Sequence, residues 1–289
     1  MKEDCPSKTA LRVAIHRAAH QVVDDVRVFE DPFALRILGM GKEPPSPSDP
    51  SWPKQGPIST GMRAFVTARS RYAEDALHIA VGRGVRQYVV LGAGLDTFAF
   101  RNTYPEDVLR AFEVDHPTTQ TWKRACLRQA DMPVPSTLTF APVDFEGETL
   151  EEGLGRAGFD NGKSAFFSWL GVTQYLTVDK VVAVLRFVAS LPPGSGIVFD
   201  YTISPSLLNP AARAAFEKIA HHVAMEGEPF RSTFVPSELR NNLAAMGFPD
   251  IEDLGPAELN ALYFQNCADK LKVGGFARLV RAANGDSDQ

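Results

Sequence analysis

A short apolar run that passes directly into two glycines constrains this sequence most strongly. The run is Tyr88-Val89-Val90-Leu91, and Gly92-Ala93-Gly94 follows at once. An uninterrupted run of β-formers is typical of a strand that is buried on both faces of a parallel sheet. Glycine adopts backbone angles that a Cβ forbids, and it lets a ligand approach the bare main chain. The stretch therefore predicts a strand, a tight turn and an adenosine-cofactor site at the carboxyl end of a sheet.

The glycines alone are also compatible with a tight turn that binds nothing. Thr97 stands where the third glycine of a G-x-G-x-x-G fingerprint would be. Two later carboxylates favour a cofactor site, because Asp115 ends a second short strand and Asp144, followed by Phe145, ends a third. An acid in the first place can accept both hydrogen bonds from a ribose diol. An acid followed by an aromatic ring suits adenine, whose amine donates and whose face stacks.

Alternating strand and helix patterns indicate an α/β fold with a doubly wound, mostly parallel sheet of seven strands. The strands are expected at residues 88–91, 112–115, 138–145, 164–170, 196–201, 251–254 and 277–282. Helices are expected within residues 1–40, 60–84 and 150–159, after Thr177, and within 209–227 and 236–247. Within the first range, Asp31 before Pro32 predicts the start of a short helix.

The chain is expected to divide into a helical cap at residues 1–85, a catalytic domain at 86–282 and a disordered tail at 283–289. Six prolines in residues 41–57 predict a loop with little regular structure, which is a candidate mobile edge. The helical insertion at about residues 203–235 follows the fifth strand and can cover the cofactor cleft as a lid.

Composition argues against several classes of partner. A net charge of −5 offers no basic surface for nucleic acid. The sequence shows no secretory signal pattern and no apolar stretch near 18 residues, so we expect a cytoplasmic protein with no membrane segment. Three widely spaced cysteines fit reduced thiols, and no metal-binding spacing is present, so we expect no metal. No sequence feature specifies the oligomeric state.

Several motifs together resemble one known family. They are residues 29–34 (F-E-D-P-F-A), residues 91–97 (L-G-A-G-L-D-T) with Arg101, residues 112–117 (F-E-V-D-H-P), residues 143–145 (V-D-F) and residues 171–176 (G-V-T-Q-Y-L). From about residue 9 to 282 the sequence resembles the class I S-adenosylmethionine-dependent methyltransferases. Within them it is similar to the leucine carboxyl methyltransferase-like group, which is rich in bacterial O-methyltransferases. The resemblance implies a Rossmann-like fold and S-adenosylmethionine as the cofactor.

The resemblance also implies roles for particular residues. Arg69 would meet the methionine carboxylate of the cofactor, a contact that an arginine can make with two donors. Arg17 aligns with a second basic residue that approaches the same carboxylate. Gly92 and Gly94 would line the main chain of the cofactor.

Two acids and the residue at the end of the fourth strand complete the implied cofactor site. Asp115 would take the ribose hydroxyls, and Asp144 with Phe145 would take the adenine. Family members often carry a glutamate at the end of the fourth strand to contact the cofactor amine. Leu170 stands there in this chain, so a backbone carbonyl is expected to serve instead.

The acceptor is expected to be a small molecule that is methylated on a carboxylate. A carboxylate is ionised at neutral pH and needs no general base, and no His/Asp base pair is evident near the glycines. Methylation of a phenol or another hydroxyl is the alternative. Thr173, Tyr175 and Tyr201 follow strand ends and are the candidates for the acceptor pocket, although the two tyrosines are also compatible with core packing.

Two other functional classes remain compatible with the residues. A nicotinamide-dependent dehydrogenase would share the glycine turn and the ribose acid, but it would favour a third glycine and would not need Asp144 and Phe145. A non-catalytic binding protein could keep the fold and lose the chemistry, and Leu170 is the one hint of this.

Overall fold

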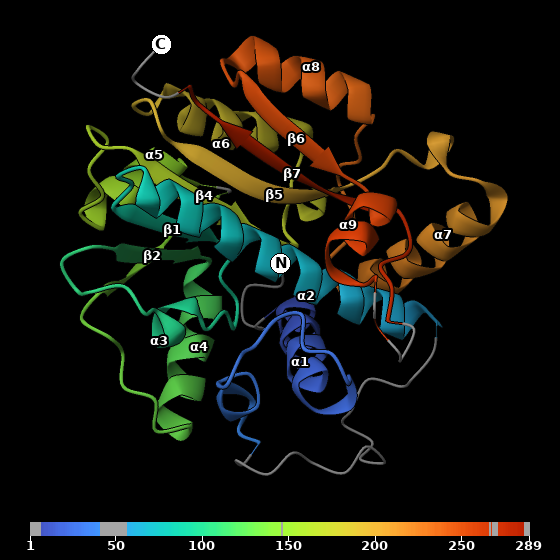
Figure 1. The fold of residues 1–289 in the computed structure, drawn as a ribbon, viewed down its shortest axis with the longest axis horizontal. Helices are drawn as coiled ribbons and strands as arrows, with labels where there is room; N and C mark the ends of the chain where they lie inside the picture. Colours follow the sequence, from blue (N-terminus) through green and yellow to red (C-terminus); the bar gives the residue numbers. More distant parts are fainter. Residues whose placement is uncertain (1–6, 41–56, 146, 266, 268–270, 286–289) are drawn as a thin grey trace.

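The computed structural model describes residues 7–40, 57–145, 147–265, 267 and 271–285. These residues form an α/β fold around a seven-stranded sheet with the strand order β3-β2-β1-β4-β5-β7-β6 (Figure 1). The strands are β1 (Gln87–Leu91), β2 (Arg110–Asp115), β3 (Leu138–Pro142), β4 (Ala165–Trp169), β5 (Gly196–Thr202), β6 (Asp250–Leu254) and β7 (Ala277–Ala283). Strands β1 to β5 pair in parallel, and β7 lies antiparallel to both of its neighbours. The predicted doubly wound, mostly parallel sheet is confirmed.

Helices cover both faces of the sheet (Figure 1). They are α1 (Lys8–Val23), α2 (Pro57–Gly82), α3 (Phe98–Arg101), α4 (Pro117–Gln129), α5 (Leu150–Arg156), α6 (Val178–Ser190), α7 (Pro210–Met225), α8 (Pro236–Met246) and α9 (Pro256–Tyr263). Three short 3-10 turns are η1 (Arg36–Leu38), η2 (Thr173–Tyr175) and η3 (Pro205–Leu207).

The alternation of side chains along each strand creates two apolar cores. Val89 of β1 and Phe199 of β5 face α5, α6 and α8 in one core. Tyr88 of β1 and Val198 of β5 face α2 and α9 in the other. Strands β1, β4 and β5 are buried at every position, as expected for central strands of a covered parallel sheet. Helix α2 lies within the predicted N-terminal cap, yet it packs directly on the sheet and shares its core.

Several predicted boundaries are corrected. Residues 24–35 are not helical, and the segment after Asp31 forms turns and then η1, because the Asp31 carboxylate accepts bonds from the Phe33 amide and the Thr97 hydroxyl. Strand β3 ends at Pro142, before Asp144. Helices α4 and α9 were not predicted, and each begins with a proline in its first turn, which suits a helix start.

The chain end is also more ordered than predicted. Ala283 belongs to β7, and the side-chain amide of Asn284 donates to the carbonyls of Ala189 and Leu191 at the end of α6. The predicted disordered tail is therefore wrong for Ala283 and Asn284, and residues 286–289 lie outside the described residues. The proline-rich segment at residues 41–56 lies outside them as well.

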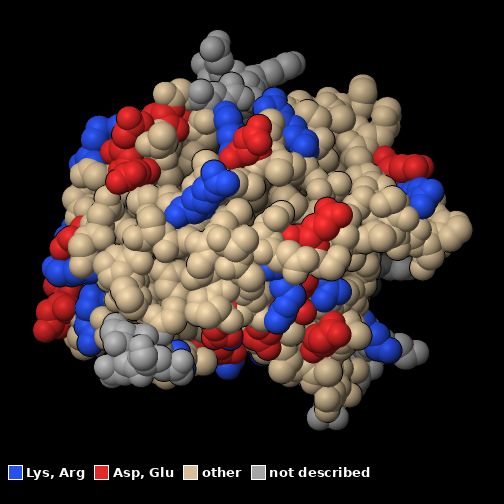
Figure 2. Space-filling model, turned by 90° about the horizontal axis from the view of Figure 1, so that it is seen from above, with Lys and Arg blue, Asp and Glu red and all other residues tan. Residues whose placement is uncertain are grey.

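The described residues contain no helix that is both long and apolar enough to cross a membrane. On the face that Figure 2 shows, basic and acidic side chains are interspersed, and among the described residues they form no broad patch of one sign.

A buried ion pair lies behind the second strand. The Nζ of Lys123 on α4 lies 2.5 Å from Oε2 of Glu113 on β2, and both side chains are almost completely shielded from solvent. Burial raises the pKa of Glu113 to about 7, although the Lys123 ammonium acts in the opposite direction. This pair holds α4 against the strand that ends in Asp115.

Replacing Lys123 with Met tests how far the fold depends on the pair. The substitution leaves Glu113 as a buried carboxylate that stays charged at high cost unless it takes up a proton. We expect Lys123→Met to lower the free energy of unfolding by about 3–5 kcal/mol at pH 8 and by less at pH 5. Urea denaturation at the two pH values measures the difference. The control Glu113→Gln/Lys123→Met is expected to recover most of the loss, and an equal loss at both pH values would contradict the ion-pair explanation.

Candidate active site

A cavity of about 340 Å³ opens at the carboxyl ends of β1, β2, β3 and β4. The loops that follow these strands form one wall, and the cavity-facing side of α2 forms another. Helix α1 and residues 227–231 of the predicted lid complete the enclosure. The cavity therefore lies at the sheet edge where parallel α/β folds bind ligands.

The turn after β1 presents bare backbone to this cavity. Gly92 has φ of 64° and Gly94 has φ of 48°, which are left-handed values that favour glycine. A Cβ on Gly92 would overlap the side chain of Val172, and a Cβ on Gly94 would lie 3.0 Å from the Cβ of Ala10 on α1. Both positions therefore exclude side chains for reasons of conformation and space.

Asp115 holds this turn in place. Its carboxylate accepts hydrogen bonds from the amides of Gly94 (2.6 Å) and His116 (2.7 Å). Burial raises the pKa of Asp115, and the two amide bonds act in the opposite direction. Asp144 and Phe145 line the same end of the cavity, beyond β3. The structure thus brings Gly92, Gly94 and the predicted ribose and adenine residues to one wall.

Arg69 of α2 lines the cavity and is almost fully buried. Its Nη1 lies 2.8 Å from Oδ2 of Asp200 on β5, and its guanidinium packs against Gly171. The Nε of Arg69 is buried and has no hydrogen-bond partner in the described part of the chain. The other oxygen of Asp200 accepts from the Gly171 amide at 2.5 Å, so Asp200 fixes both Arg69 and the loop after β4.

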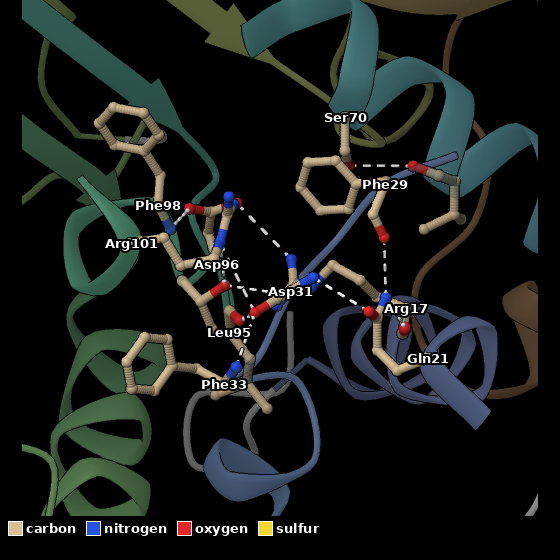
Figure 3. A network of polar contacts seen from close by, with 12 residues as sticks. Arg17, Gln21, Phe29, Asp31, Phe33, Ser70, Leu95, Asp96, Phe98 and Arg101 are labelled. Atoms are coloured by element: carbon tan, nitrogen blue, oxygen red, sulfur yellow. Dashed lines mark hydrogen bonds and ion pairs between the residues drawn. The ribbon is translucent and has the colours of Figure 1, made fainter. Parts of the chain in front are cut away.

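Arg17 lines the cavity from α1, but its charge is already matched. Its Nε lies 2.7 Å from Asp31, its Nη1 lies 3.6 Å from Asp96, and its Nη2 donates to the carbonyl of Leu95 at 2.5 Å (Figure 3). These contacts fasten α1 to the turn after β1. The structure places Arg17 beside the cavity as a part of its frame.

Two of the three predicted acceptor-pocket residues do not line the cavity. The Thr173 side chain is buried, and its hydroxyl donates to the carbonyl of Asp200 at 2.6 Å. The Tyr201 side chain is buried in the core on the opposite face of β5, and its hydroxyl donates to Asp253 at 2.9 Å. Both predictions are corrected, because these hydroxyls bond within the protein. Tyr175 and Leu170 do line the cavity.

The sequence analysis did not identify three residues of the site: Asp200 on β5, and Glu228 and Arg231 in the insertion that follows β5. Asp200 precedes Tyr201 on β5 and faces α2, because successive strand residues point to opposite sides. Its position near the carboxyl end of a buried strand was an available signal. Glu228 and Arg231 line the cavity from the insertion, and Glu228 accepts a bond from the Thr9 amide at 3.1 Å. This contact joins two segments far apart in the sequence, so no local pattern indicated it.

These observations fit an adenosine cofactor with an amino-acid tail. The glycine turn lines the cavity, and Asp115 lies beside it. The partnerless Nε of Arg69 is a buried donor that a ligand carboxylate can satisfy. In the described part of the chain, no cluster of His, Cys, Asp or Glu could hold a metal ion.

Comparison with known proteins agrees with this geometry. The sequence profile of the leucine carboxyl methyltransferase family matches residues 10–189. A Bacillus subtilis protein, provisionally named an S-adenosyl-L-methionine-dependent methyltransferase, is 40% identical over 207 residues, which span 71% of this chain and 68% of the relative. A protein of Saccharopolyspora erythraea with the same provisional name is 32% identical over 193 residues, or 66% of each chain.

The fold has a counterpart among solved structures. A protein of Thermobifida fusca, provisionally identified as a methyltransferase, superposes on this chain with a TM-score of 0.55 and is 19% identical in sequence. The superposition covers 78% of this chain and 83% of the Thermobifida fusca chain. This likeness supports the fold alone, whereas the profile and the sequence relatives support the family. The chain therefore belongs to the leucine carboxyl methyltransferase family and is an S-adenosylmethionine-dependent methyltransferase.

Proposed function

We propose that the protein transfers the methyl group of S-adenosylmethionine to a carboxylate oxygen of a small molecule. Membership of the family favours a methyltransferase over a nicotinamide-dependent dehydrogenase or a non-catalytic binding protein. The observation that supports a carboxylate is the chemistry of the cavity wall near β4 and the insertion, where Lys180, Arg231 and the Tyr175 hydroxyl stand beside a single carboxylate, Glu228, and, among the described residues, no histidine.

The cofactor is assigned to the half of the cavity beside β1, β2 and β3. In this arrangement Asp115 accepts the ribose hydroxyls, while Asp144 and Phe145 hold the adenine. Gly92 and Gly94 leave room for the cofactor main chain. These assignments are supported by the shared wall that the five residues form.

The amino-acid end of the cofactor is assigned to the region between α2 and the loop after β4. Arg69 keeps Nη1 on Asp200 and offers its buried Nε to the carboxylate. Arg17 supports this region indirectly, since its own charge is matched by Asp31. Leu170 offers only an apolar side chain, so its part in binding is limited to its main chain.

The acceptor is assigned to the opposite half, near Tyr175. Burial raises the pKa of Tyr175, and its hydroxyl donates to the Thr9 hydroxyl at 3.4 Å. The Phe230 ring packs against it, with the ring centres 5.6 Å apart. The Arg231 amide donates to the carbonyl of Gln174 at 2.6 Å, which places this cationic residue beside Tyr175 on the cavity wall.

This wall suits an acceptor that is already ionised. Among the described residues, His116 is the only histidine that lines the cavity. It follows β2, and β1 lies between β2 and β4, the strand that precedes Tyr175. The chemistry that the cofactor supplies when bound is an electrophilic methyl group on a sulfonium. The residues near Tyr175 then need only to orient a nucleophilic oxygen and exclude water, because a carboxylate requires no proton removal.

Replacing Asp115 with Asn tests the cofactor assignment. The amide keeps the shape of the side chain but removes the charge that strengthens hydrogen bonds to the ribose, and it keeps only one acceptor for the Gly94 and His116 amides. We expect S-adenosylhomocysteine to bind about tenfold or more weakly, because charge-assisted bonds contribute about 1.5–3 kcal/mol. Isothermal titration calorimetry measures the affinity. The exposed Asp179→Asn on α6 is the matched control, and unchanged binding in folded Asp115→Asn would refute the assignment.

The pH dependence of kcat/KM tests whether the acceptor oxygen is ionised. A carboxylate has an ordinary pKa of about 4, so its charge is constant between pH 6 and pH 9. We expect kcat/KM for the acceptor to stay level across this range. A value that climbs steadily towards pH 10 would indicate a phenol, whose ordinary pKa is about 10.

The chemical stability of the product gives the direct test of esterification. The protein is incubated with methyl-labelled S-adenosylmethionine and a panel of carboxylic acids, phenols and alcohols. We expect label to enter a carboxylic acid and to be released by alkaline hydroxylamine, which cleaves methyl esters. Label that enters a phenol or alcohol and resists hydroxylamine would overturn the carboxylate proposal and leave the methyltransferase assignment intact.

A further inference from the structure

Three side chains from distant parts of the chain meet in the acceptor half of the cavity. The hydroxyl of Thr9 on α1 donates to Oε2 of Glu228 in the insertion, and the Thr9 amide donates to the same oxygen at 3.1 Å. The hydroxyl of Tyr175, which follows β4, donates to the Thr9 hydroxyl at 3.4 Å. All three residues line the cavity, and we call them the acceptor cluster.

Glu228 uses only one of its two carboxylate oxygens in these contacts. Oε2 accepts both bonds from Thr9, whereas Oε1 has no hydrogen-bond partner in the part of the chain that the structure describes. Each oxygen of a carboxylate can accept about two hydrogen bonds. The carboxylate is therefore held in place by one oxygen and has the other available for a ligand.

The negative charge of Glu228 is favoured by α1 but is not matched by a cation of the protein. Thr9 lies in the first turn of α1, and the amino end of a helix favours a negative charge nearby. Among the described residues, Arg12 pairs with the neighbouring Glu226, and no basic side chain forms an ion pair with Glu228. A fixed negative charge therefore lies on the wall beside the acceptor.

This charge restricts which acceptors fit, because it repels the carboxylate that we propose is methylated. Two like charges in a poorly solvated site are unfavourable unless an opposite charge lies close to them. Arg231, three residues after Glu228, lines the same wall and can attract the acceptor carboxylate. A positive charge on the acceptor itself would be attracted by Glu228. An acceptor with both charges matches both side chains.

We propose that Glu228 selects acceptors that carry a protonated amine close to the carboxylate that receives the methyl group. The ammonium donates to the free oxygen of Glu228, while Thr9 acts as a positioning residue that holds the other oxygen. The ammonium keeps its proton, so Glu228 binds the acceptor and removes no proton from it. The acceptor is then an amino acid with a free amine and not an acylated one. This inference rests on the proposed transfer to a carboxylate.

The test compares acceptors that differ only at the amine. The probes are the common α-amino acids, β-alanine and 4-aminobutyrate, each with its N-acetyl derivative and with the des-amino acid in which hydrogen replaces the ammonium group. Transfer of labelled methyl gives kcat/KM for each probe. For the best free amine we expect kcat/KM to exceed the values for its two partners by about tenfold or more, as for a charge-assisted bond.

Replacing Glu228 with Gln is expected to remove this preference. The amide keeps an oxygen for Thr9 and loses the charge that attracts the ammonium. We expect the ratio of kcat/KM between the free amine and its des-amino partner to fall to about one. The change is expected in KM rather than in kcat, because the ammonium is bound equally before and during the transfer.

Two controls separate a contact with the acceptor from other effects. Glu226→Gln removes the neighbouring charge of the insertion, which pairs with Arg12 and does not line the cavity, and it is expected to keep the wild-type ratio. Calorimetry with S-adenosylhomocysteine is expected to give the same affinity for the wild-type protein and for Glu228→Gln. A tenfold loss of this affinity would assign Glu228 to the cofactor and overturn the proposal.

A second variant keeps the proposal falsifiable if Glu228→Gln does not fold. Glu228→Asp retains the charge but moves it away from the acceptor by one methylene group, so we expect the ratio to fall by about threefold or more. An unchanged ratio in this variant, or in Glu228→Gln, would contradict the proposal.

The remaining outcomes distinguish this inference from the carboxylate proposal. If esters form with no preference for a free amine, or if no amine-bearing probe is methylated, the selection by Glu228 is wrong and transfer to a carboxylate can still stand. If Glu228→Gln instead lowers kcat for phenols or alcohols, Glu228 is a general base and both proposals fail. Label that resists alkaline hydroxylamine also shows the failure of the carboxylate proposal.

Discussion

The two hydrogen bonds that Asp115 accepts from the Gly94 and His116 amides are the constraint on which the site depends. They tie the turn after β1 to the end of β2 and fix the left-handed backbone of Gly94. Because Gly94 has no Cβ, α1 can approach until Ala10 lies against the turn. The same bare backbone that suits a ligand therefore also lets a helix close over it.

Polar contacts at both ends of α1 help to hold the cover of the cavity. At one end of α1, Arg17 bonds to Asp31 and to the Leu95 carbonyl. At the other end, the Thr9 amide donates to Glu228, and Arg12 pairs with Glu226. Exposed ion pairs contribute little stability, so the contacts with the insertion are weaker than those at the buried end. Opening of the enclosure is accordingly expected to begin between α1 and the insertion.

Much of the fold could be predicted from local patterns. The central strands are short apolar runs that are bounded by glycine or proline. Each run predicts a buried strand, whichever strands lie beside it in the sheet. Pro142 shows the limit of this approach, because the apolar pattern continues past the residue where β3 ends. Helix α4 was missed because its buried face includes Lys123 and Gln120, whose polar groups are satisfied only by contacts with β2.

Positions on the cavity wall were predictable where chemistry and strand position coincide, as at Asp115 and Asp144. They were not predictable where a role depends on a distant partner. Arg69 is held by Asp200, 131 residues away, and no spacing rule connects them. Tyr201 was chosen over its neighbour Asp200 because the sequence does not reveal which face of β5 meets α2. Successive residues of a strand point to opposite faces of the sheet. An error of one residue therefore exchanges a side chain in the core for one that faces α2 and the site.

A crystal structure of the complex with S-adenosylhomocysteine tests the central claim most directly. That claim is that the cofactor lies across the glycine turn, with its sugar at the end of β2. The account predicts both ribose hydroxyls within hydrogen-bond distance of the Asp115 carboxylate and the adenine against Phe145. A ligand bound with its ribose away from Asp115, or outside the cavity beneath α1, would contradict it.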